Sequence, residues 1–123
     1  MTTLIEGAHT GEFILSEAEH GRSRDNITIA SGSGVILPGD VLAKVTASGK
    51  FKKSTDTGSD GGQTAIAVAI SGCDATSADK VIPAITRAAQ VKAVALTYDA
   101  SVSDATKRGT KATQLAAVGI VVR

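Results

Sequence analysis

The residues best suited to catalysis in this sequence of 123 residues are a single cysteine and two histidines. Cys73 paired with His9 or His20 would supply the thiolate and the imidazole of a nucleophilic site. Both histidines lie near the start of the chain, far from Cys73, so such a pair would need the first residues to fold back in a fixed position. We instead expect two solvated histidines and a small packed cysteine at the end of a buried strand.

The remaining polar residues give no better candidate for chemistry. The cysteine and the histidines lack the spacing of a metal site. The glycine-rich stretches SGSG and GSDGG do not stand between a strand and a helix, so they predict flexible turns rather than phosphate-binding loops. Six aspartates fall in predicted loops or helix caps, where hydrogen bonds to the local backbone explain them: Asp56, Asp60, Asp74, Asp79, Asp99 and Asp104. We therefore expect neither an enzyme nor a bound metal or other cofactor.

The composition predicts one small domain with a thin core. Hydrophobic residues make up 42% of the chain, but aromatic residues only 2%, and tryptophan is absent. Ala, Val, Ile and Leu each bury less area than a large aromatic side chain, so each contributes modestly to stability. A small domain of this kind often relies on a partner or on oligomerisation.

The charge and the apolar runs exclude two classes of partner. The formal net charge is +1, whereas a nucleic-acid binder needs a basic face and a peripheral membrane protein a polybasic segment. No apolar run approaches the roughly 20 residues that span a bilayer. We expect no nucleic acid and no membrane as partners. The absence of a signal-peptide pattern and the single cysteine predict folding in a reducing cytoplasm.

Apolar periodicity and turn residues predict a mainly β (α+β) domain over residues 35–123, with one helix in its C-terminal region. The stretch VILPGDVLAKV predicts a strand, a turn at Pro38-Gly39-Asp40 and a second strand, and Ser48-Gly49-Lys50 predicts another tight turn. The further predicted elements are strands over Phe51–Lys53, Ala65–Ile70, Asp79–Arg87, Val91–Asp99 and Val118–Arg123, a polar loop over Ser54–Thr64, and a helix over Asp104–Leu115.

Several of these elements carry finer expectations. The uninterrupted apolar stretch Ala65–Ile70 predicts a strand that is buried on both faces. Pro83 predicts a sheet edge or a bulge, because proline cannot donate a hydrogen bond to a neighbouring strand. A reversal at Ala88–Gln90 would pair the strand after it with the strand before it. Ser103 is the expected N-cap of the helix, with Asp104 in its first turn.

Residues 1–34 differ from the rest and predict an extended arm. They carry two short apolar stretches, which are separated by polar and charged residues and followed by the linker sequence SGSG. Neither stretch can form a core alone. We expect strands over Glu12–Leu15 and Asn26–Ala30, with Ile27 and Ile29 on one side.

Such an arm is suited to adding a strand to a sheet of another protein. The two arginines between the apolar stretches could bind an acidic partner. The residues that we expect to dock are Phe13, Ile14, Leu15, Arg22, Arg24, Ile27 and Ile29. The alternative is that these residues pack on their own domain as a first hairpin.

Three stretches in order carry a resemblance to a known family: PGDVLAKVTASGKFKK, then AIAVAISGCDAT, then SVSDATKRGTKATQLAAVGIVVR. Together they resemble the head decoration proteins of tailed bacteriophages, over Val35–Arg123. The chain lacks an aromatic residue or two that the phage lambda member of this family has, so core packing and trimer contacts differ in detail.

The resemblance implies a structural protein of the virion and no enzyme. Members form homotrimers on the local three-fold axes of the expanded capsid, at its outer surface. There they clamp neighbouring copies of the major capsid protein against the pressure of the packaged DNA. Their arm is disordered when free and adds a strand to capsid-protein sheets. The implied partners are thus the phage major capsid protein and two further copies of this chain, and the protein is made in the host cytoplasm.

Two other functions stay open at this point. A small barrel-type carrier module, similar to biotinyl or lipoyl domains, would need a modified lysine at a hairpin tip. The nearest candidate is Lys80, but the sequence around it does not predict a symmetric hairpin. A small enzyme would need a bound metal or a reactive Cys73.

Overall fold

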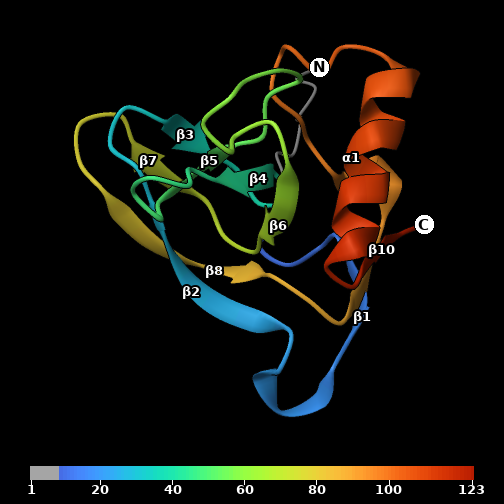
Figure 1. Ribbon diagram of the computed structural model, residues 1–123. Coiled ribbons are helices and arrows are strands. Elements are labelled where there is room, and N and C mark those ends of the chain that lie inside the picture. The colour runs from blue at the N-terminus through green and yellow to red at the C-terminus, as the bar shows by residue number, and fades with distance from the viewer. Residues whose placement is uncertain (1–8) are drawn as a thin grey trace, which may run out of the picture.

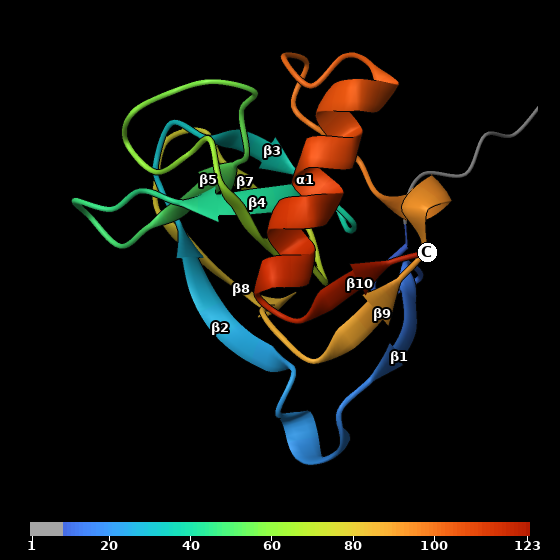
Figure 2. The ribbon, with the colours of Figure 1, turned by 45° about the vertical axis from the view of Figure 1, so that its right-hand side comes forward.

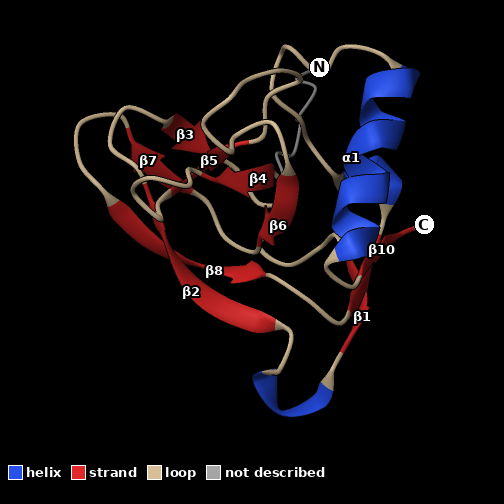
Figure 3. Ribbon diagram, in the orientation of Figure 1, coloured by secondary structure: helices blue, strands red, loops and turns tan. Residues whose placement is uncertain are grey.

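The computed structural model describes residues 9–123, which form a small β-barrel with a three-stranded sheet and one long helix beside it (Figure 1). The strands are β1 (Ile14–Glu17), β2 (Arg24–Ile29), β3 (Gly34–Ile36), β4 (Val41–Lys44), β5 (Phe51–Lys53), β6 (Ala65–Ala69), β7 (Cys73–Ala75), β8 (Lys80–Ile85), β9 (Ala89–Val91) and β10 (Ile120–Val122). The helical elements are the 3₁₀ turns η1 (Glu19–Gly21) and η2 (Ala93–Ala95) and the α-helix α1 (Ala105–Ala117). Strands dominate the picture (Figure 3), so the predicted β-rich fold with a helix in its C-terminal region is confirmed.

Five strands close into a barrel in the order β2-β5-β4-β6-β8. β2 is antiparallel to β8 over six residue pairs, whereas it meets β5 only at the parallel pair Ile29 and Phe51. Side chains that alternate along these strands point inward and fill the barrel together with residues of the β3–β7 pair. This barrel core comprises Ile27, Ile29, Ile36, Leu42, Phe51, Ala67, Ala69, Ala75, Ile82 and Ala84.

A second core lies between the barrel, α1 and the separate sheet β1-β9-β10 (Figure 2). In that sheet β9 is central, antiparallel to β1 and parallel to β10. α1 packs against β10 and β6 and contributes the fully buried Leu115. This outer core comprises Phe13, Val41, Ala65, Val68, Ile70, Ile85, Ala89, Val91, Leu96, Leu115 and Ile120.

β6 lies between the two cores and contributes to both. Ala67 and Ala69 belong to the barrel core, whereas Ala65 and Val68 belong to the outer core. The predicted strand buried on both faces is therefore confirmed, apart from the half-buried Ile66.

The helix exists close to its predicted bounds, but its N-cap is wrong by one residue. Asp104, not Ser103, has the extended backbone of an N-cap, and its carboxylate accepts a hydrogen bond from the Lys107 N–H at 2.9 Å. The helix continues to Ala117 and ends before Gly119, whose φ of +86° favours glycine.

Pro83 lies in an interior strand of the barrel, so the predicted edge or bulge position is wrong. Its carbonyl accepts a hydrogen bond from the Ile70 N–H at 3.1 Å, at the point where the β6–β8 pairing ends. A residue other than proline at position 83 would donate its N–H to the Ile70 carbonyl. In this protein, that carbonyl accepts a hydrogen bond from the Gly11 N–H at 3.0 Å. The missing donor of Pro83 thus leaves no carbonyl unsatisfied there.

The predicted strand over Val91–Asp99, paired with the strand before it, is wrong. Ala88 does turn the chain, with a φ of +51°, but β9 then pairs with β1 and β10 and not with β8. Because both edges of β9 are occupied, β8 has no access to it. The chain leaves the sheet after Val91 and enters η2, and only Thr97 forms a further bridge, with Asp40.

The N-terminal residues are more deeply packed than expected. β1 and β2 do not form a hairpin with each other; β1 joins the three-stranded sheet and β2 joins the barrel. Phe13 and Ile29 have no exposed surface, and Ile27 is 6% exposed. The expectation that both apolar stretches belong to an arm outside the domain is therefore wrong from Phe13 onward. The first stretch joins the three-stranded sheet and the second joins the barrel. Residues 1–8 of the predicted arm lie outside the described residues.

Candidate functional site

The apolar residues expected to dock on a partner mostly complete the protein's own cores. Phe13 packs in the outer core, and half-buried Ile14 packs against it from its position opposite Val91. Ile27 and Ile29 point into the barrel. Of the five apolar residues, only Leu15 is exposed, at 48% of its surface. Docking through the buried residues would require the barrel or the outer core to open.

The two arginines lie at the corner where β1, η1 and β2 meet. The Arg24 guanidinium donates to both Glu17 carboxylate oxygens at 2.5–3.1 Å, and the Ser23 hydroxyl donates to the same carboxylate at 2.6 Å. The hydrogen bonds from Arg24 hold the pKa of Glu17 below its usual value. Arg24 is therefore already paired within the chain, although it is partly exposed.

Arg22 is the freer of the two. Its carbonyl accepts a hydrogen bond from Arg87 at 2.7 Å, while another nitrogen of Arg87 pairs with Asp25. The exposed guanidinium of Arg22 makes no ion pair with any described residue. Of the seven predicted residues, Leu15 and Arg22 are thus the two that are exposed and still able to meet a partner.

The sequence did not identify the most exposed aliphatic side chains. Val94 is 97% exposed, Val81 67% and Val35 53%. Val121 of β10 lies on the outer face of the three-stranded sheet, beside Gln90 of β9. Exposed aliphatic side chains of this size suit contacts with another protein. The exposure of Val94 could not be predicted, because the sequence pattern placed this residue in a strand. In the structure it lies in η2, which exposes its side chain.

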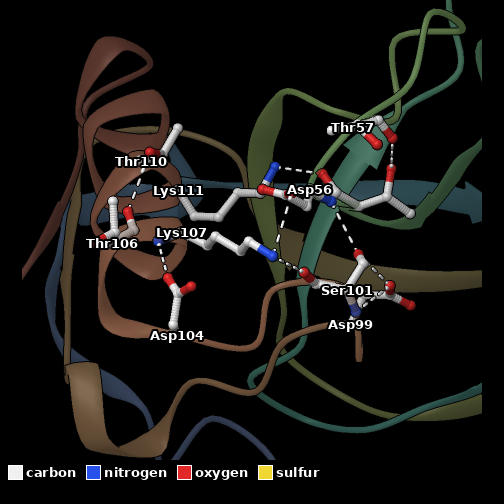
Figure 4. Close-up of polar contacts among 10 residues, drawn as sticks. Asp56, Thr57, Asp99, Ser101, Asp104, Thr106, Lys107, Thr110 and Lys111 are labelled. Atoms are coloured by element: carbon white, nitrogen blue, oxygen red, sulfur yellow. Dashed lines mark hydrogen bonds and ion pairs between the residues drawn. The ribbon is translucent and has the colours of Figure 1, made fainter.

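A polar network around α1 fixes two long loops to the body (Figure 4). Lys111 is only 1% exposed, and its ammonium donates to the carbonyls of Thr55 and Gln63 at 2.6 and 2.7 Å. Burial lowers the pKa of this lysine. One turn earlier, the Lys107 ammonium lies 3.7 Å from Asp56.

The network continues from the first loop into the second. The Asp56 N–H donates to the Ser101 hydroxyl at 3.0 Å, and that hydroxyl donates to the Asp99 carboxylate at 2.6 Å, which lowers the pKa of Asp99. No buried side-chain nitrogen or oxygen atom within residues 9–123 lacks a hydrogen-bond partner, so the network serves a structural role. It also confirms that Asp99 and Asp104 stabilise local backbone, as do Asp60 and Asp74 in their own turns.

Cys73 and His20, two of the residues with catalytic potential, lie on separate elements of the fold. Cys73 lies in β7 opposite Ile36, and burial raises the pKa of its thiol, which makes it a weaker nucleophile at neutral pH. His20 lies in the exposed turn η1, 3.8 Å from Glu19. Within residues 9–123, no group of three or more His, Cys, Asp and Glu side chains could hold a metal ion.

Lys80 does not have the setting of a carrier lysine. It is the first residue of β8 and lies opposite Ile29 of β2. The preceding strand, β7, pairs with β3 and not with β8, so no hairpin places Lys80 at its tip. The geometry gives no support to the carrier module.

Comparison with known proteins identifies a family that matches nearly the whole chain. Residues 3–120 match the family model described as "Bacteriophage lambda head decoration protein D". No curated protein sequence matches the chain. Among the described residues, no helix is both long enough and apolar enough to cross a bilayer.

Proposed function

The chain belongs to the family of bacteriophage lambda head decoration protein D, and on this basis we propose that it forms homotrimers that bind the outer surface of the expanded phage head at its three-fold axes. In this role the protein stabilises the shell against the pressure of packaged DNA and catalyses no reaction. The observation that carries the proposal is the family match, which spans residues 3–120 of 123 and thus both cores and the segment before them.

The surface of the domain supports a role in protein contacts. Exposed aliphatic residues lie on several separate elements: Leu15 on β1, Val81 on β8, Val94 on η2 and Val121 on β10. A cyclic trimer needs two different complementary patches on each copy, and binding to a shell needs a third. Exposed apolar side chains on several elements are consistent with that requirement.

The turn before β1 and the packing of β1 and β2 limit the proposed arm to residues 1–8. The Gly11 N–H donates to the Ile70 carbonyl and Phe13 enters the outer core, so the body begins there. Eight extended residues reach roughly 28 Å, which is enough to touch a neighbouring subunit. Three such segments on one trimer act together, so the avidity exceeds the affinity of each by about 10² to 10⁴.

The test uses purified shells before and after expansion. We expect the full chain to saturate expanded shells, to leave unexpanded shells undecorated, and to raise the temperature at which the expanded shells rupture. Light scattering coupled to size exclusion gives the mass of the free protein and of the protein released from the shell. We expect the released protein to have the mass of a trimer. Equal binding to both shell forms, or binding that leaves the rupture temperature unchanged, would contradict the proposed function.

A further inference from the structure

Two adjoining hollows run along the side of the barrel. One, of about 490 Å³, is lined mainly by polar residues of the loop before β6, and the other, of about 370 Å³, lies beside β2 and is mostly apolar. Both share Lys44 and Ile66, so they form one elongated groove. Ile27, Phe51 and Val118 line its apolar end. An elongated groove of this kind suits an extended peptide better than a compact ligand.

One wall of the groove is an unpaired strand edge. In the β2–β8 ladder Asn26 lies opposite Pro83, which has no N–H and whose carbonyl points away, toward Ile70. Asn26 and Pro83 are therefore a pair without mutual hydrogen bonds, and the N–H and carbonyl of Asn26 point to the other side of β2. There β5 reaches β2 only at Ile29, so no described strand pairs with Asn26 on that side.

The groove also carries an uncompensated positive charge. Lys44 is exposed, and its ammonium makes no hydrogen bond or ion pair with any other residue in the part of the chain that the structure describes. Asp25, at the other end, is neutralised by Arg87. A carboxylate on a ligand that lies in the groove would complement Lys44.

We propose that this groove receives an extended segment of the shell protein, which adds a strand to the free edge of β2 at Asn26 and places an acidic side chain against Lys44. Backbone hydrogen bonds to Asn26 supply affinity, and apolar side chains of the segment meet Ile27 and Phe51 at the floor. The strands that the structure describes are poorer occupants when they come from a second copy, because each is already fixed in a sheet of its own. This inference rests on the proposed function, since it assigns a contact to the same shell.

Hydrogen exchange of the full chain, free and bound to expanded shells, tests the proposal directly. We expect the Asn26 amide to exchange at least about tenfold more slowly on the shell, whereas the Ile27 amide, already bonded to β8, is protected in both states. Shell binding without new protection at Asn26 would overturn the groove but leave the proposed function intact. Absence of any shell binding would overturn both.

The same measurement identifies a wrong occupant. Protection of Asn26 that appears in the free trimer, and disappears on dilution to monomers, would assign the groove to a second copy and overturn the proposal. Protection that is lost in a chain without residues 1–8 would assign it to the protein's own N-terminal segment, with the same consequence.

Two substitutions supply an independent test with matched controls. Asn26→Pro removes the backbone donor but leaves the ladder to β8 intact, so we expect at least a tenfold loss of shell affinity, whereas Asn26→Ala keeps the donor and the affinity. Lys44→Glu should weaken binding by about fivefold at low salt, and Lys80→Glu, an exposed reversal on β8, should not. Circular dichroism establishes that each variant is folded. Equal affinity of the two Asn26 variants would contradict strand addition.

Discussion

Phe13 shows how a single side chain ties the first residues to the body. It has no exposed surface and lies in the outer core with residues from β9, α1 and β10. With aromatic residues at only 2% of the chain, few side chains are this large. A phenylalanine in a core otherwise built from aliphatic side chains therefore carries a large share of the burial.

We expect Phe13→Ala to lower the free energy of unfolding by about 3–5 kcal/mol, because it removes a fully buried ring and leaves a cavity. Urea denaturation of purified protein measures the change. Leu15→Ala, two residues later and half exposed, is the matched control and should change stability by about 1 kcal/mol or less. Similar small effects of both substitutions would mean that residue 13 does not belong to the core.

Lys111 predicts a pH dependence whose sign follows from its burial. Burial lowers its pKa in the folded protein, so the unfolded chain binds the proton more tightly. The free energy of unfolding should then rise with pH between the lowered pKa and that of an ordinary lysine. Lys111→Met removes this rise, and at neutral pH it also costs about 1–3 kcal/mol, because the carbonyls of Thr55 and Gln63 lose their donor.

Denaturation curves at several pH values from neutral to alkaline measure this difference. Lys107→Met is the control, because the Lys107 side chain is 35% exposed, whereas Lys111 is 1% exposed. Its curve should run parallel to that of the unchanged protein. A Lys111→Met curve that also runs parallel would show that the ammonium of Lys111 is not buried.

At the scale of elements, the turn before β4 lies very close to η2. This contact fixes the position of η2 against the barrel. Gly39 has a φ of +91°, and a Cβ there would lie 2.5 Å from the carbonyl oxygen of Ala95. The same turn bonds to Thr97, whose N–H donates to the Gly39 carbonyl at 3.0 Å. Only glycine satisfies both the backbone conformation and the space.

Gly39→Ala should therefore lower the free energy of unfolding more than the same substitution at a glycine that has a positive φ but no close neighbour. Gly32→Ala is the control, since Gly32 has a similar φ of +88° but nothing within 4 Å of the added Cβ. We expect the control to cost about 1 kcal/mol and Gly39→Ala to exceed it by about 2 kcal/mol, measured by thermal or urea unfolding. Equal costs would show that η2 can move away from the turn.

The elements also show what the sequence could and could not reveal. Apolar runs and turn residues located β4, β5, β6 and α1 to within a few residues, because those signals are local. Partners of strands are set by distant residues, so the pairing of β9 with β1 and β10 could not be read from the reversal at Ala88. Nor could the burial of Ile27 and Ile29, since a short apolar stretch looks the same in a free arm and in a barrel.

At the scale of the whole molecule, β1 and β2 are parts of the fold, whereas the proposed contact with the shell rests on residues 1–8. We expect a chain that lacks residues 1–8 to fold and to form trimers but to lose most of its affinity for expanded shells. A chain that lacks residues 1–30 should not fold, because it loses β1, β2 and with them Phe13, Ile27 and Ile29. Circular dichroism and shell sedimentation measure the two properties separately.

Two results would contradict this division. Undiminished shell binding of the shorter truncation would remove residues 1–8 from the contact with the shell. A folded protein without residues 1–30 would show that β1 and β2 are dispensable for the body and would restore the longer arm.

The sheet in which β9 lies between β1 and β10 has a consequence for biosynthesis. Its outer strands come from opposite ends of the sequence, and Phe13 shares its core with Ile120. On the ribosome, Phe13 is therefore made long before Ile120, and the outer core cannot be completed until the segment that carries Ile120 has been made. Folding of the two outer strands is thus coupled, because the sheet is complete only when both β1 and β10 are present.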